Sequence, residues 1–61
     1  MFDKAPFKSG ELVRVTDRRS DFYGETGVIR GKAKRDGVWV FLLHMSKVAG
    51  TPEIAAEFLE R

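Results

Sequence analysis

Two stretches of the sequence decide the fold: GELVRVTD at residues 10–17 and FYGETGVI at residues 22–29. In the first stretch, Val13 and Val15 alternate with polar residues. β-Branched side chains at a spacing of two are typical of a strand with one buried face. The second stretch returns to apolar residues after a polar loop. We therefore predict a strand, a loop and a returning strand, with both valines in the core.

Glycines and one Asp-Gly pair mark the turns of this pattern. We expect Gly24 to permit a tight turn and Gly27 to allow either a close approach of two backbones or a bulge. Gly31 is expected to mark a second bend. Further along, Asp36-Gly37 separates two apolar runs. Asp-Gly in such a position is a strong signal for a two-residue hairpin turn, so a second hairpin is predicted after the first.

The tail from residue 51 to residue 61 has two interpretations. As a helix, it would have Thr51 as N-cap and Pro52 at the first helical position, with Ile54 stacked on Phe58. As a strand, it would place Ile54 and Phe58 on one face. Eleven residues form only a marginal isolated helix, so tertiary contacts decide between the two.

The order of glycine, alternating valines, polar loop and Gly-x-x-Gly-hydrophobic resembles the KOW motif of ribosomal proteins and NusG-class transcription-elongation factors. The resemblance implies an all-β, SH3-like small barrel and favours the strand interpretation for the start of the tail. One departure is Asp17-Arg18-Arg19-Ser20, where the family usually has a glycine. For that reason the family's RNA contacts are not carried over to this loop.

Pattern and resemblance together predict about five strands. We expect an extended lead-in at 1–8 and a barrel at 9–61, with strands at about 11–16, 26–33, 37–44 and 52–56, a short closing element at 58–60, and a short helix or 3₁₀ turn as the alternative for 52–60.

Length and composition set further bounds. The 61 residues have room for one domain with a small core. The absence of cysteine excludes disulfides and thiolate metal sites. The longest apolar run, residues 38–43, is far shorter than a membrane span, and the N-terminus lacks the features of a signal peptide. We expect a soluble, cytoplasmic protein without a membrane partner.

Catalytic chemistry has little support in the sequence. His44 is the one histidine, and the acidic residues lack metal-ligand spacing. The serines have no adjacent base pattern. We therefore predict no catalytic residue, no metal site and no cofactor, with His44 as a surface or packing residue.

Basic residues concentrate in one part of the chain. Residues 14–35 hold seven basic and three acidic residues, whereas residues 51–61 hold three acidic and one basic. Cations contact phosphates and aromatic rings stack on unpaired bases, so RNA, DNA or a nucleoprotein complex is one predicted partner. The candidate nucleic-acid-binding residues are Arg14, Arg18, Arg19, Phe22, Tyr23, Arg30, Lys32, Lys34 and Arg35.

A protein partner is the alternative. Residues 38–43 are apolar on both faces, which indicates a central strand or a strand that uses one face as an interface. The candidate interface consists of Trp39, Phe41 and Leu43. In the competing interpretation these three are core residues, or are covered by Phe2 and Phe7.

A third hypothesis is an enzyme formed by oligomerisation. The small plasmid-type dihydrofolate reductases are SH3-like barrels of similar length whose tetramer shares a pore. Their pore motif is Val-Gln-Ile-Tyr, whereas the corresponding place here reads Pro52-Glu53-Ile54-Ala55. This mismatch makes the reductase the weakest of the three hypotheses.

Overall fold

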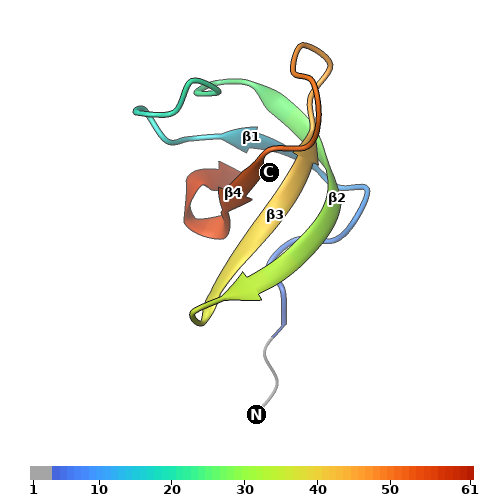
Figure 1. The fold of residues 1–61 in the computed structure, drawn as a ribbon, viewed down its shortest axis with the longest axis vertical. Helices are drawn as coiled ribbons and strands as arrows, with labels where there is room; N and C mark the ends of the chain where they lie inside the picture. The colour runs from blue at the N-terminus through green and yellow to red at the C-terminus, as the bar shows by residue number, and fades with distance from the viewer. Residues whose placement is uncertain (1–3) are drawn as a thin grey trace.

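Five antiparallel strands form a single sheet in the order β4-β3-β2-β1-β5 in the computed structural model, which describes residues 4–61 (Figure 1). Each predicted strand is present, and its bounds differ by at most two residues from the prediction. The elements are β1 (Leu12–Val15), β2 (Thr26–Arg35), β3 (Val38–His44), β4 (Glu53–Ala55), the 3₁₀ turn η1 (Ala56–Phe58) and β5 (Leu59–Glu60).

The sheet curls into a small barrel because its two edge strands are joined by a very short link. β4 and β5 lie at opposite edges of the sheet, and only η1 separates them along the chain. In a flat sheet, four inter-strand gaps would place these edges roughly 19 Å apart. Three residues span at most about 11 Å when fully extended. The edges must therefore approach each other, and the predicted all-β, SH3-like barrel is confirmed.

The interpretation of the whole tail as an α-helix is wrong, whereas a 3₁₀ turn is present within it as η1. β4 runs along β3 with Ile54 opposite Phe41, and β5 runs along β1 with Leu59 opposite Val15. Pairing with two strands from elsewhere in the chain outweighs the local capping signal, since a helix this short has little stability of its own. Within residues 4–61, no helix has the length and apolar character needed to cross a membrane.

The core lies inside the curled sheet and includes two residues from outside the predicted strands. Phe7, in the predicted lead-in, is buried, and its ring meets that of Phe41 edge-on at 5.4 Å between centroids. Met45, which sequence reasoning placed in a loop, is also buried. Phe2, which was also predicted to cover this face of the sheet, lies outside the described residues. The buried core consists of Phe7, Val13, Val15, Ile29, Phe41, Leu43, Met45 and Leu59.

Gly27 is required by close packing against the end of β3. A Cβ built at this position would lie 3.0 Å from Met45 Cγ and 3.1 Å from the carbonyl oxygen of His44. A larger side chain would have to displace backbone as well as side-chain atoms. The expected close approach of two backbones at this glycine is confirmed.

The hairpin of β2 and β3 turns at Asp36-Gly37, as predicted. Both residues have positive φ, 51° and 79°, which is the geometry of a type I′ turn. Arg35 lies directly opposite Val38 across this turn. The two-residue turn therefore sets the register of the hairpin from Arg35 as far as Gly31, which lies opposite Leu42.

A β-bulge between Ile29 and Gly31 changes which residues of β2 face inward. One extra residue shifts the alternation of side chains by one position. Beyond the bulge, Lys32 lies opposite Phe41 and Lys34 lies opposite Trp39. Two lysines are thus placed on the same face of the sheet as the aromatic residues of β3.

Residues from both ends of the described chain meet at Phe7. The side chain of Arg61 forms an ion pair with Glu11 and donates a hydrogen bond to the carbonyl oxygen of Pro6 at 2.7 Å. Its guanidinium lies 5.1 Å from the centroid of the Phe7 ring. The backbone N–H of Lys8 and the Arg61 guanidinium lower the pKa of Glu11. These contacts hold the segment that carries Phe7 against the barrel.

Candidate binding surface

Side-chain to backbone hydrogen bonds shape the loop between β1 and β2. Asp17 Oδ1 accepts a hydrogen bond from the backbone N–H of Arg19, and Ser20 Oγ accepts one from the backbone N–H of Phe22, both at 3.0 Å. Short polar side chains commonly replace glycine in organising such turns. Asp17 and Ser20 thus form ordered turns where the KOW family has a glycine.

The aromatic pair of the loop divides between core and solvent. Phe22 is half-buried and packs against the core. Tyr23 is 52% exposed. Phe22 therefore anchors the loop to the barrel, while Tyr23 presents its ring to the surroundings. Arg18 and Arg19 are both exposed in the same loop.

An open depression of about 420 Å³ lies between the loop, β1 and β5. Arg14 Nε donates to Glu60 Oε2 at 3.1 Å, and the two side chains form an exposed ion pair. The hydrogen bond to the Glu60 carboxylate raises the pKa of the Arg14 guanidinium. Arg14 keeps further N–H donors beyond those used by Glu60, because a guanidinium carries five. The lining residues are Arg14, Val15, Thr16, Arg18, Tyr23, Gly24 and Glu60.

A second group of cations and an aromatic ring lies on the β2–β3 hairpin. The Nζ atom of Lys34 is 5.3 Å from the centroid of the Trp39 ring, and that of Lys32 is 5.9 Å away. Trp39 is half-buried and stacks on Phe41 with 6.4 Å between the ring centroids. Figure 1 shows the hairpin turn and the loop at different ends of the barrel, with the segment of β4 and η1 between them in that view.

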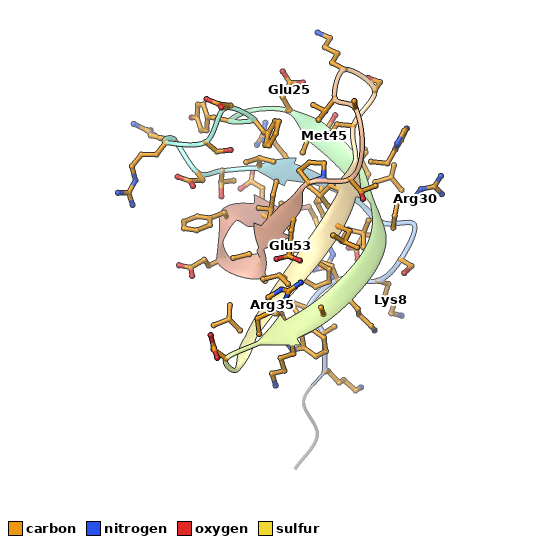
Figure 2. All side chains as sticks on the ribbon, viewed as in Figure 1. Lys8, Glu25, Arg30, Arg35, Met45 and Glu53 are labelled. Carbon is orange, nitrogen blue, oxygen red and sulfur yellow. The ribbon has the colours of Figure 1, made fainter. Side chains whose placement is uncertain are left out.

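The remaining two predicted cations belong to neither group. Arg35 forms an exposed two-pronged ion pair with Glu53, with 2.8 Å from Nη2 to Oε2, and the hydrogen bond raises the pKa of Arg35. Arg30, at the bulge, projects from the bend of β2 on the side away from the loop (Figure 2). The structure thus divides the nine predicted nucleic-acid-binding residues among separate places.

The predicted protein interface is wrong for two of its three residues. Phe41 and Leu43 have no exposed surface at all, because they point into the curled sheet where Phe7 and Ile29 pack around them. Only Trp39 keeps some exposure. The competing interpretation, that this face of the strand is core, is confirmed for Phe41 and Leu43.

The opposite face of β3 is the one that remains uncovered. Val38 is 44% exposed, and Val40 and Leu42 are half-buried. Sequence alternation identified both faces but could not tell which would turn inward. Glu60 was also missed as a contributor to the depression, since its position beside Arg14 follows from the pairing of β5 with β1.

The described residues contain no cluster of three or more histidine, cysteine or acidic side chains that could hold a metal ion. His44 is exposed and lies opposite Val28 on the outer face. No family model matches the chain, and no curated protein or solved structure matches it either.

Proposed function

We propose that this chain is a non-catalytic module that binds nucleic acid through the depression beside the loop. The observation that carries the proposal is the convergence of Arg14, Arg18 and Tyr23 on that depression. Arg18 and Tyr23 come from the loop and Arg14 comes from β1. All three have exposed side chains that are not part of the core. The resemblance to the KOW motif bears on the fold and contributes no contact residues in this loop.

The chemistry of these side chains fits a phosphate backbone. A guanidinium presents planar donors that match phosphate oxygens in two-pronged contacts. Tyr23 offers a ring for stacking and a hydroxyl for a hydrogen bond. Glu60 orients Arg14 through the ion pair, so that this cation is already positioned before a ligand arrives.

The direct test is the salt dependence of binding to a fluorescently labelled oligonucleotide. In Arg14→Gln/Arg18→Gln, which removes two cations that line the depression, we expect weaker binding and a slope of log affinity against log salt that is shallower by roughly 1.4 for a single strand. The matched control is Lys8→Gln/Lys47→Gln, which removes the same charge from exposed lysines elsewhere. Equal loss in both variants would show that only net charge matters, and would reject the depression as the site.

A substitution that is expected to raise the affinity for the oligonucleotide provides a second test of the same site. Glu60→Gln removes the one carboxylate that lines the depression, while an amide of the same shape can still accept a hydrogen bond from Arg14. We expect tighter binding to the oligonucleotide in this variant, because a phosphate no longer meets a like charge. Unchanged or weaker binding would contradict a phosphate site beside Arg14.

A second candidate function is association of two copies of this chain through the outer face of β3. Apolar residues of β3 continue there onto Ala33 and Ala55, which lie opposite Val40. Arg35 and Glu53 sit beside this patch. A two-fold axis would set each cation against the other copy's anion, as a self-complementary interface requires.

Sedimentation velocity over a concentration series tests this association. Leu42→Ser should shift a dimer to monomer. A parent chain that is monomeric at every concentration would exclude the association.

A further inference from the structure

The arrangement around Trp39 extends the proposed function from phosphate contact to contact with bases. Lys32 and Lys34 lie two residues apart on one face of β2, and both ammonium groups are within 6 Å of the same ring. Residues two apart on a strand are separated by about 6.6 Å, which is comparable to the spacing of successive phosphates in an extended strand. Single-strand binding surfaces combine cations that contact the backbone with aromatic rings on which bases stack, and both kinds of side chain are present here.

The bulge in β2 produces this arrangement. Without the extra residue, the alternation that buries Ile29 would continue through Gly31 and Ala33, and the lysines would face outward. With it, Lys32 and Lys34 lie opposite Phe41 and Trp39. Stacking of Trp39 on Phe41 also fixes the orientation of the indole, so that little conformational freedom is lost when a planar ligand binds.

We propose that Trp39, Lys32 and Lys34 form a second contact site that selects single-stranded over duplex nucleic acid by stacking one unpaired base on the indole. This proposal rests on the proposed function, because the same strand would bind at both places. Duplex DNA keeps its bases stacked internally and offers no free base face. Lys32 and Lys34 would contact the phosphates that flank the stacked base.

The chain offers a direct reporter, because Trp39 is its single tryptophan. Titration of the unmodified protein with a short single-stranded oligonucleotide should quench the Trp39 fluorescence in step with the anisotropy change of a labelled strand. A duplex of the same sequence should bind more weakly and leave the emission unchanged. Binding of the single strand with no change in Trp39 emission would overturn this inference and leave the proposed function standing. Absence of binding to any oligonucleotide would overturn both.

Variants separate the contributions of charge and ring. Lys32→Gln/Lys34→Gln should bind the single strand more weakly than the charge-matched Lys8→Gln/Lys47→Gln. Trp39→Leu keeps an apolar side chain against Phe41 but no aromatic face, and should bind roughly five- to a hundredfold more weakly. Equal affinity of the two lysine variants would overturn the proposal. So would quenching of Trp39 by polyglutamate as strong as that by the oligonucleotide, since this would identify an acidic protein segment as the ligand.

Discussion

The two faces of β3 are almost equally apolar in sequence, yet they have opposite fates in the fold. Phe41 and Leu43 on the inner face have no exposed surface, whereas Val38 on the outer face is 44% exposed. The inner face meets Phe7, which comes from outside the sheet. Among the described residues, the outer face lies beside its neighbours in the sheet and the exposed pair of Arg35 and Glu53. Burial is thus decided by the direction in which the sheet curls, and hydrophobicity alone does not reveal it.

The largest expected difference between the faces is in stability. Phe41→Ala should cost about 3–5 kcal/mol of unfolding free energy, which is close to the whole stability of a domain this small. Leu42→Ala should cost about 1 kcal/mol, because Leu42 is only half-buried. Urea unfolding followed by Trp39 fluorescence measures both. Similar losses in the two variants would mean that the outer face is also covered in solution.

Two glycines of β2 sharpen the same comparison. Gly27 faces inward against Met45 Cγ and the His44 carbonyl, while a Cβ at Gly31 would meet only Leu42, at 3.1 Å from Cδ1. Gly27→Ala should lose about 1–3 kcal/mol through overpacking. Gly31→Ala should be near neutral or stabilising, because the end of Leu42 can move and alanine lowers the entropy of the unfolded chain. Thermal unfolding of the two variants measures these changes in stability. A greater loss of stability in Gly31→Ala than in Gly27→Ala would reverse the assignment of the inner and outer faces.

The Asp36-Gly37 turn between β2 and β3 should contribute less to the free energy of unfolding than the core residues do. Gly37 has a φ of 79°, and an L-residue there costs about 1–2 kcal/mol. Gly37→Ala should lower the urea midpoint by a corresponding amount, whereas Asp36→Asn should leave it almost unchanged because Asn-Gly suits the same turn. A stable Gly37→Ala variant would indicate that strand pairing alone sets the register.

The smallest expected effect concerns the segment that carries Phe7, which packs on the inner face of β3 and is held there by Glu11 and Arg61. The pKa of Glu11 is lowered in the folded state by the Lys8 N–H and by Arg61. Its charged form therefore stabilises the fold above the ordinary glutamate range, and this contribution is lost as the pH falls through the lowered pKa. Glu11→Gln should unfold with a flatter pH dependence in acid than the parent chain. The control is Glu25→Gln, at an exposed loop position, and identical acid profiles for the parent and Glu11→Gln would exclude this role.

Local sequence patterns predicted the strands because each strand and turn depends mainly on residues that are close together in the sequence. Val13 and Val15 alternate within β1, and Asp36-Gly37 forms the expected turn. Gly27 packs as its position suggested. In each of these cases the deciding interaction lies within the segment or with the neighbouring strand.

The features that escaped prediction depend on contacts distant in sequence. Gly31 marks a bend at the bulge beside Arg30, but the glycine alone does not show that Lys32 comes to lie beside Trp39. The partnership of Arg14 with Glu60 requires β5 to pair with β1. Position along the chain does not show where a side chain lies in the folded barrel, so the division of the candidate cations between loop and hairpin follows only from the structure.

The short link through η1 also bears on the order of folding. The pairing of Arg14 with Glu60 joins residues 46 positions apart, and non-local pairings of this kind slow the folding of barrels. During synthesis, the hairpin of β2 and β3 can form as soon as it leaves the ribosome, but β1 has no second partner until residues 59–60 emerge. Until then Val13 and Val15 lack one side of their enclosure. The nascent barrel therefore exposes an open edge of β1 until β5 pairs with it.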